Sequence, residues 1–244
     1  MRRFYCLNEN IIDDTVYFDK NESKHIGRVL RLEKGEQIIV CTGDGMDRYC
    51  TLLYVGEQAT ARIDKIVKNK NEPESEIILF QAVIKNEKMD FLVQKVTELG
   101  ITKIVPVITE RTVVKFEDNK KEQKKQERWQ KIALEACKQC GRSRVPQVLC
   151  AQAFNDAVKM FERCDLKLVA YEEEKTTGIV QAMTKSKNIG YFIGAEGGIT
   201  EKEHQLLKDA GAISVSLGKR ILRAETAAIV TGGIILALNG EMDV

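Results

Sequence analysis

The pattern of hydrophobic and polar positions changes in character near residue 70. Before that point the apolar runs are short, and they lie at residues 35–40, 49–55 and 61–67. The first of these runs leads into Thr42-Gly43-Asp44-Gly45, a strong turn signal. Short strands joined by tight turns are typical of a small β-barrel. The N-terminal part of the chain is therefore predicted to be rich in strands.

From residue 76 onward, apolar runs of strand length alternate with segments of helical spacing. The predicted strands lie at residues 77–83, 104–108, 167–171, 191–193 and 213–217. This alternation predicts an α/β domain with a parallel sheet flanked by helices. Residues 68–75 are polar and include Pro73, which is typical of a linker. Two domains are therefore predicted, at residues 1–72 and 73–244.

Helical spacing is clear in four segments, at residues 89–99, 129–140, 201–211 and 224–239. Thr200 and Glu203 have the spacing of a capping box and predict the start of the third helix. Residues 115–128 form a highly charged run, predicted to be an exposed loop leading into the second helix. The fourth helix contains Gly232 and Gly233, which destabilise it by roughly 1 kcal/mol each. We therefore expect another backbone to pack closely against it.

The composition is that of an ordinary soluble globular protein, with 43% hydrophobic and 30% charged residues. The net charge of +2 is too small to identify a partner, so a nucleic-acid site must come from clustered cations. The N-terminus lacks the apolar core of a signal peptide, and the longest apolar stretch, residues 229–238, is too short to span a bilayer. We therefore expect a cytoplasmic protein with no membrane partner.

The seven cysteines are odd in number and scattered, which favours free thiols in a reducing compartment. Cys137 and Cys140 form a C-x-x-C pair, but they lie in a predicted helix and no second pair exists. Only His25 and His204 add nitrogen donors. Because a structural zinc site needs four well-placed ligands, no metal site is predicted.

Two glycine-bearing stretches follow predicted strands near the C-terminus. Residues 194–200 read GAEGGIT, and residues 217–226 read LGKRILRAET. Glycine lets the main chain approach a ligand closely because it has no Cβ. Ligands of open α/β sheets bind at the carboxyl ends of strands. The two stretches are therefore predicted to form one pocket built mostly from backbone, although neither common glycine-rich phosphate motif is present.

The string GAEGGIT followed by LGKRILRAETA closely resembles the C-terminal motifs of the RsmE-type rRNA methyltransferases of the SPOUT superfamily. The resemblance covers essentially the whole chain and includes KMD at 88–90, ELG at 98–100 and EACKQCGR at 135–142. It implies a PUA-like RNA-binding β-barrel domain at residues 1–72. It also implies a SPOUT methyltransferase domain with a trefoil knot at residues 73–244. The knot or a dimer partner would then supply the backbone expected beside Gly232 and Gly233.

The chemistry is also implied by this resemblance. Members of the family use S-adenosylmethionine to methylate N3 of a specific uridine in the 16S rRNA of the small ribosomal subunit, and they work as homodimers. The alternatives are a related SPOUT enzyme acting on tRNA or 23S rRNA, and a non-catalytic RNA-binding assembly factor. The intact glycine stretches argue against the assembly factor, and the missing G-x-G-x-x-G argues against a Rossmann dehydrogenase.

If the pocket holds S-adenosylmethionine, the glycines let main-chain amides approach it, and apolar side chains of the second stretch cover the adenine. The expected cofactor-binding residues are Val169, Tyr171, Ile193, Gly194, Glu196, Gly197, Gly198, Leu217, Gly218, Ile221, Leu222 and Thr226. Thr226 either hydrogen-bonds to the ligand or caps the last helix. Ala195 stands where the family usually has proline, so the first stretch is expected to be less pre-organised.

N3 of uracil is a weak nucleophile until it loses its proton. Arg223 is the expected catalytic group, because a guanidinium aimed at a uracil carbonyl oxygen stabilises developing negative charge. The alternative is a structural salt bridge from Arg223 to Glu225 or Glu196. Because arginine stays protonated, the proton acceptor is either Glu225 or water, and the sequence does not decide between them.

Clustered cations mark candidate phosphate contacts. Helical spacing over residues 24–31 puts three cations on one face and three apolar residues, including Val29, on the other, which predicts either an RNA contact or a solvated face. The arginines that follow residue 140 either compensate a helix dipole or hold phosphates. The arginines at the N-terminus either join the RNA contact or belong to a frayed chain end. The candidate RNA-binding residues are Arg2, Arg3, Lys24, Arg28, Arg31, Lys88, Arg111, Arg142 and Arg144.

Overall fold

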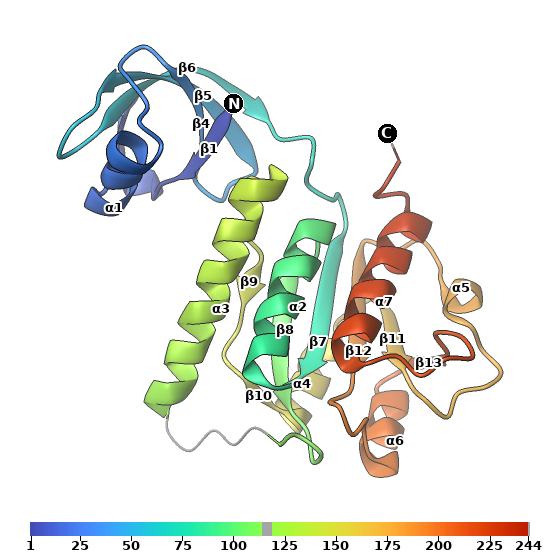
Figure 1. Ribbon diagram of the computed structural model, residues 1–244. Coiled ribbons are helices and arrows are strands. Elements are labelled where there is room, and N and C mark those ends of the chain that lie inside the picture. The colour runs from blue at the N-terminus through green and yellow to red at the C-terminus, as the bar shows by residue number, and fades with distance from the viewer. Residues whose placement is uncertain (114–118, 244) are drawn as a thin grey trace. The chain divides into compact units, whose positions relative to one another are not determined.

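The computed structural model describes residues 1–113 and 119–243. The chain forms two compact units, and most of their helices and strands are labelled in Figure 1. The first unit consists of Met1–Glu72 together with Cys137–Val145, and the second consists of Pro73–Ala136 and Pro146–Val244. Residues 137–145, which the predicted division placed in the second domain, thus belong to the first unit.

The first unit is built on a six-stranded sheet with the order β1-β4-β5-β6-β3-β2. Its strands are β1 (Arg2–Tyr5), β2 (Ile11–Ile12), β3 (Thr15–Tyr17), β4 (Gln37–Cys41), β5 (Met46–Tyr54) and β6 (Thr60–Lys68). β1 pairs parallel to β4, and the other neighbours pair antiparallel. A short 3₁₀ turn, η1 (Asn8–Asn10), precedes β2. The core includes Phe4, Phe18, Ile26, Ile38 and Leu52, so the strand-rich prediction is confirmed.

The helix predicted over residues 24–31 is only partly formed. α1 (Lys20–Lys24) is followed by a π-helical turn, η2 (His25–Val29), and Arg31 has a φ of 52°. A π-turn inserts an additional residue, so positions three and four apart no longer share one face. The predicted apolar face does not form as a unit, because the Val29 side chain is 63% exposed, whereas Ile26 is fully buried.

Largely buried polar contacts join residues 137–145 to the strands of the first unit. Arg3 donates to both carboxylate oxygens of Asp47. The side-chain amide of Asn69 donates to Asp47 and to the backbone oxygen of Gly141, at 2.9 Å in each case. The hydroxyl of Ser143 also donates to Asp47. Because these groups satisfy one another, the network fixes the segment against β1 and β5.

Glu72 forms a second buried contact with the same segment. Its carboxylate accepts from the backbone N–H groups of Ser143 and Arg144 at 2.6 and 2.7 Å, and from Nε of Arg142 at 3.2 Å. The side chains of Arg142 and Glu72 are only 3% and 5% exposed. Loss of either partner would leave an uncompensated charge in a buried place, so the pair is a structural feature.

The second unit contains a sheet with the order β10-β8-β7-β12-β11-β13, and β9 also pairs with β8. Its strands are β7 (Glu76–Ala82), β8 (Lys103–Ile108), β9 (Gln147–Val148), β10 (Gln152–Ala153), β11 (Leu166–Ala170), β12 (Asn188–Ile193) and β13 (Ile213–Val215). Within the described residues every pairing in this sheet is parallel. β7 and β12 are almost entirely buried, as expected for central strands covered on both faces. The predicted α/β fold is confirmed.

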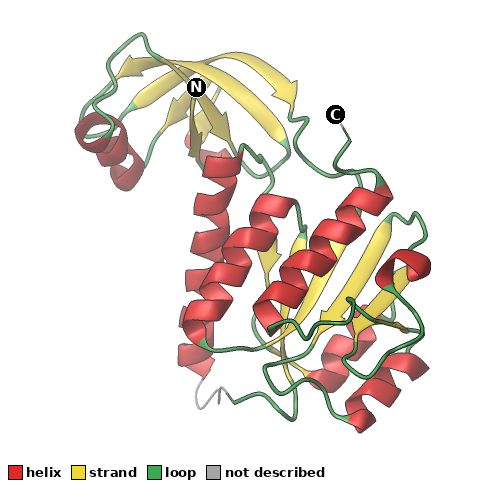
Figure 2. Cartoon of the chain, turned by 45° about the vertical axis from the view of Figure 1, so that its right-hand side comes forward, coloured by secondary structure: helices red, strands yellow, loops and turns green. Residues whose placement is uncertain are grey.

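Helices cover both faces of this sheet, as Figure 2 shows. They are α2 (Asn86–Leu99), α3 (Asn119–Cys140), α4 (Phe154–Phe161), α5 (Ile179–Ala182), α6 (Glu201–Asp209) and α7 (Ala224–Asn239). α2 and α7 pack together, while α4 and α6 cover a cluster that includes Phe80, Phe161 and Phe192. Of the predicted charged run, residues 115–118 lie outside the described residues. Within those residues, no helix combines the length and the apolar character needed to cross a bilayer.

The two glycines of α7 have different surroundings. A Cβ on Gly232 would lie 2.8 Å from the hydroxyl of Tyr191, a fully buried residue of β12. That hydroxyl donates to the backbone oxygen of Ala228 at 3.3 Å. A Cβ on Gly233 would meet no atom within 4 Å. The expectation of a backbone neighbour is therefore wrong for Gly232, whose neighbour is a tyrosine side chain, and the trefoil knot stays a prediction.

Candidate active site

The carboxyl ends of β12, β11 and β13 lie side by side, because these strands are parallel neighbours in the sheet. Residues 194–200 follow β12, residues 171–178 follow β11 and residues 216–223 follow β13. A short bridge between Gly178 and Ser216 joins the last two loops. The two glycine-bearing stretches therefore begin at the same edge of the sheet, with the β11 loop between them.

Loop 194–200 makes a tight turn on itself. The N–H of Gly198 donates to the oxygen of Ala195 at 2.9 Å, and Gly198 has a φ of 73°, which favours glycine. A Cβ on Gly194 would lie 2.9 Å from the carbonyl carbon of Gly198. The turn itself therefore requires glycine at both positions. The predicted capping box of Thr200 and Glu203 follows and starts α6.

Side chains from two neighbouring strands hold this loop. Arg111, just after β8, donates from Nη1 to the oxygen of Gly197 at 2.7 Å. Gln81, at the end of β7, donates from Nε2 to the oxygen of Gly194 at 3.3 Å. Arg111 was expected at the RNA, and its contact with RNA stays a prediction beside this supporting role.

Sequence reasoning missed Gln81. The residue is fully buried, and its Oε1 has no hydrogen-bond partner among the described residues. A buried acceptor without a partner is uncommon in folded proteins, and it indicates a place where a bound group would be satisfied. The available signal was one polar residue inside the apolar run ILFQAVI at residues 78–84.

Lys88, in the first turn of α2, lies between two carboxylates. Its Nζ is 3.4 Å from Oε1 of Glu196 and 3.7 Å from Oε2 of Glu225. Glu196 belongs to the loop after β12, and Glu225 to the first turn of α7. Lys88 was expected at the RNA, and its contact with RNA stays a prediction beside these two ion pairs.

Glu196 is held as a carboxylate. Partial burial acts to raise its pKa, but hydrogen bonds from the backbone, including the N–H of Lys85, and from the Lys88 side chain outweigh that effect. The pKa of Glu196 is therefore lower than its ordinary value. The expected contact of Glu196 with a cofactor would involve a charged group.

Arg223 is the N-cap residue of α7, and its side chain is exposed. In the described part of the chain its guanidinium has no ion pair, so the alternative of a salt bridge to Glu225 or Glu196 is wrong. Those carboxylates face Lys88 instead. Thr226 is exposed and lies three residues after the N-cap, so the alternative that it caps α7 is also wrong.

The loop after β13 presents apolar side chains. Leu217 and Leu222 are half-buried, and Ile221 is 80% exposed. Gly218 has a φ of 106°, a conformation that other residues rarely adopt, and a Cβ there would meet no atom within 4 Å. The loop therefore combines an exposed apolar surface with an approachable main chain.

Three expected cofactor contacts stay predictions, but the structure limits how these residues can reach a ligand. Val169 is fully buried among the side chains covered by α4 and α6, and Ile193 is 2% exposed, so only their main chains can reach a ligand. Tyr171 stacks on His204, with ring centroids 3.7 Å apart and an interplanar angle of 14°. One face of the Tyr171 ring is therefore already covered.

Two predicted RNA contacts are wrong. The guanidinium of Arg3 donates to Asp47, and their side chains are 11% and 9% exposed. Arg142 is paired with Glu72 in the buried contact described above. Each of these cations is already paired with a carboxylate. Because the pair is buried, a phosphate group could reach the cation only by breaking the pair.

The other candidate RNA contacts of the first unit keep free cationic groups. They are exposed, and none has a side-chain hydrogen bond or ion pair within the described residues. These residues are Arg2, Lys24, Arg28, Arg31 and Arg144. Their contact with RNA stays a prediction.

The C-x-x-C pair has structural partners. The Cys137 thiol donates to the backbone oxygen of Arg144 at 3.3 Å, and the Cys140 thiol to the oxygen of Cys137 at 3.8 Å. Burial raises the pKa of Cys137 to about 12. Among the described residues, no group of histidine, cysteine or acidic side chains is arranged to hold a metal ion.

Two family models match the chain. An RNA methyltransferase domain matches residues 70–236, and an RNA methyltransferase PUA domain matches residues 18–64. The first match covers more than half of the chain and includes both glycine-bearing loops.

Named relatives agree with these matches. Ribosomal RNA small subunit methyltransferase E of Bacillus subtilis is 34% identical, over 93% of each chain. The protein of the same name from Synechocystis is 33% identical, over 97% of this chain and 77% of its own. A crystal structure of ribosomal RNA small subunit methyltransferase E from Neisseria gonorrhoeae, bound to S-adenosylmethionine, is 34% identical, with a TM-score of 0.89 over 98% of each chain. The chain therefore belongs to the RNA methyltransferase family of ribosomal RNA small subunit methyltransferase E.

Proposed function

We propose that this protein transfers the methyl group of S-adenosylmethionine to N3 of a specific uridine in 16S rRNA. One observation carries the proposal. The chain is 34% identical, over 98% of its length, to a small subunit rRNA methyltransferase whose crystal structure contains S-adenosylmethionine. The choice of uridine N3 comes from the resemblance of the two glycine-bearing motifs. These motifs lie where parallel sheets bind ligands.

The residues at this edge fit the cofactor. The open main chain at Gly218 and the apolar side chains of Leu217 and Ile221 suit a flat adenine ring. The partnerless Oε1 of Gln81 would accept a hydrogen bond from an amino group of the ligand. The carboxylate of Glu196 would attract the positive charges of the cofactor.

Bound S-adenosylmethionine would supply an electrophilic methyl group, and the protein's own part is to hold the uracil and to manage one proton. The guanidinium of Arg223 is exposed and has no ion pair within the described residues, so it is available to donate to a uracil oxygen and to stabilise the charge that develops there. Glu225, two residues further on, has a buried Oε2 that lacks a hydrogen bond among the described residues and lies 3.7 Å from Nζ of Lys88. The Glu225 carboxylate, or water, accepts the proton from N3.

The protein is also proposed to act in the cytoplasm as a homodimer on the small ribosomal subunit. Each of the paired helices α2 and α7 leaves a large apolar side chain exposed, Phe91 at 48% and Leu238 at 39%. The dimer is proposed from the family resemblance, and these two side chains are candidates for its interface. Analytical ultracentrifugation is expected to give the mass of two chains, and the mass of one chain at micromolar concentration would contradict the dimer.

Methyl transfer to defined RNAs tests the activity. The protein is incubated with tritium-labelled S-adenosylmethionine and with 30S subunits, free 16S rRNA, 50S subunits or tRNA. The product is mapped by reverse transcription, which stops at N3-methyluridine because the methyl group blocks base pairing. Label at one uridine of 16S rRNA is expected. Label only in tRNA or 50S subunits would assign a different substrate, and cofactor binding without label on any RNA would refute the proposed reaction.

A further inference from the structure

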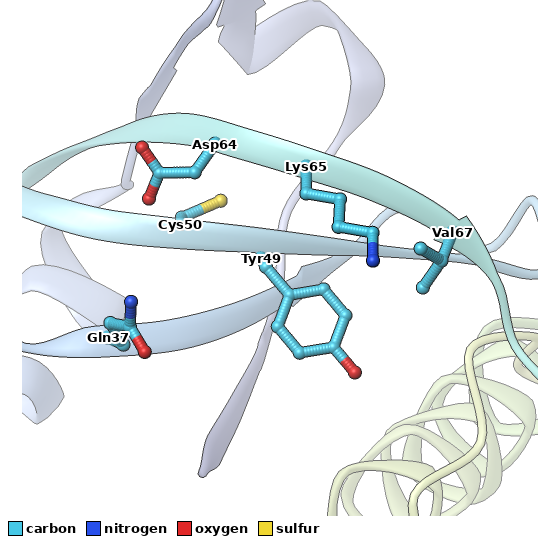
Figure 3. Close-up of a pocket in the computed structure, with 6 residues that line it drawn as sticks. All are labelled: Gln37, Tyr49, Cys50, Asp64, Lys65 and Val67. Atoms are coloured by element: carbon cyan, nitrogen blue, oxygen red, sulfur yellow. The ribbon is translucent and has the colours of Figure 1, made fainter.

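A hollow on the sheet of the first unit shares no residue with the candidate active site. It is lined from β4, β5 and β6 by Gln37, Tyr49, Cys50, Asp64, Lys65 and Val67, as Figure 3 shows, and its volume is about 450 Å³. Volumes of this order accommodate small ligands or part of a larger one. All six residues belong to strands of one sheet, so the sheet register fixes their relative positions.

Tyr49 and Lys65 are directly opposite each other in the β5–β6 ladder. Their side chains both line the hollow (Figure 3). Neither the hydroxyl nor the ammonium has a hydrogen bond or ion pair within residues 1–113 and 119–243. A half-buried tyrosine usually finds a partner for its hydroxyl. The pair is therefore a partly covered aromatic surface with two unsatisfied polar groups.

The hollow is lined by one carboxylate, that of Asp64, and one ammonium, that of Lys65. The carboxylates of these three strands are both paired, Asp47 with Arg3 and Asp64 with Arg62. Lys65 has no such partner in the described chain, and the side-chain amide of Gln37 at the other side of the hollow also has none. The hollow thus offers a flat ring, one free positive charge and an amide that both donates and accepts hydrogen bonds.

We propose that this hollow, here termed the Tyr49 platform, binds one nucleotide of a single-stranded RNA segment. The base stacks on the ring of Tyr49, the phosphate lies at Nζ of Lys65, and the amide of Gln37 reaches a base edge. An aromatic side chain on an open sheet with a neighbouring cation suits an unpaired base, which stacks independently of its sequence. A duplex exposes no base for stacking. The inference rests on the proposed function, which supplies an RNA substrate, and it adds an RNA contact within the first unit.

The test measures binding of the full-length chain to a short fluorescent single-stranded oligoribonucleotide and to the duplex of the same sequence. Tyr49→Ala is expected to weaken single-strand binding about fivefold or more, and Tyr49→Phe to change it less than about twofold, because the ring remains. Lys65→Ala is expected to weaken binding and to lower the salt slope by about 0.7. Tyr54→Ala is the matched control, because Tyr54 lies on the same strand, is 55% exposed and does not line the hollow.

Binding by Tyr49→Ala as tight as by Tyr54→Ala would overturn the platform, and so would an equal loss of duplex binding. If Tyr49→Ala fails to fold, as judged by circular dichroism, an unchanged salt slope in Lys65→Ala overturns it instead. Calorimetry with S-adenosylmethionine distinguishes failure of the platform from failure of the proposed function. Single-strand binding through Tyr49 in a chain that binds no cofactor would refute the proposed reaction and support the platform.

Discussion

Lys88 and Glu225 form an ion pair with 3.7 Å between Nζ and Oε2, and the same ammonium is 3.4 Å from Oε1 of Glu196. One cation of α2 thus contacts both the loop after β12 and the first turn of α7. Because these two segments carry the motifs shared with the methyltransferase family, Lys88 links the two halves of the candidate active site.

Lys88→Met removes this charge and keeps most of the side-chain length. We expect S-adenosylmethionine to bind about three- to fivefold more weakly, because Glu196 and Glu225 lose their shared partner. The free energy of unfolding should change by less than about 1 kcal/mol, since the pairs are partly exposed. Calorimetry and urea unfolding measure the two effects. Lys95→Met is the matched control, because it removes an ion pair with Glu98 on the same helix. Equal losses of cofactor affinity in both variants would show that the Lys88 contact has no special role.

Arg223→Ala is expected to lower methyl transfer at least about a hundredfold, as loss of an oxyanion donor does in other enzymes. Cofactor affinity should stay within about tenfold, because the guanidinium is exposed and holds no other part of the described chain. Single-turnover transfer and calorimetry give the two values. Arg163→Ala, which changes an exposed arginine just after α4, is the control. Wild-type turnover in Arg223→Ala would refute the assigned role.

The loops of the candidate site were predictable from the sequence, because glycines after strand-like runs are local features. The side chains that support these loops were not. Lys88 and Arg111 reach the loop after β12 from positions 108 and 86 residues away, and local spacing contains no information about such contacts. Both were therefore predicted only as RNA contacts.

The two wrong predictions of RNA contacts have the same origin. Arg3 and Arg142 are cations in clusters, but their partners Asp47 and Glu72 lie 44 and 70 residues away in the sequence. The cationic face over residues 24–31 depended on a regular helical period, which the π-turn of η2 interrupts. Local patterns therefore predicted the strands, the helices and the fold class, whereas long-range pairing decided which charges stay free.

Gly194→Ala and Gly197→Ala compare two glycines of one loop. At Gly194 the added Cβ would lie 2.9 Å from backbone of Gly198, which cannot move without opening the turn. At Gly197 the nearest atoms are side-chain carbons of Arg111 at 3.5 Å, an ordinary contact. We expect Gly194→Ala to lower the free energy of unfolding by about 1–3 kcal/mol and Gly197→Ala by less than about 1 kcal/mol. Urea denaturation measures both, and equal values would contradict the close approach.

The contacts of Asp47 are expected to make the stability of the protein sensitive to acid. Burial acts to raise its pKa, but hydrogen bonds from Arg3, Asn69 and Ser143 outweigh burial, so its pKa in the folded chain lies below 3.8. A carboxylate whose pKa is lowered by folding stabilises the protein above its unfolded pKa, and this contribution disappears as the pH falls through the folded value. Stability is therefore expected to decrease as the pH drops below about 4.

Asp47→Asn isolates this contribution because it keeps the side-chain shape and removes the charge. At pH 7 the variant should be less stable by about 1–3 kcal/mol, the cost of losing hydrogen bonds to a charged group. Its unfolding midpoint should fall less than that of the wild-type chain as the pH is lowered from about 5 to about 3, because the amide that replaces the carboxylate does not titrate. Asp14→Asn changes an exposed carboxylate and should keep the wild-type profile. If Asp47→Asn and the wild-type chain lose stability in parallel over this range, the acid sensitivity arises from other carboxylates.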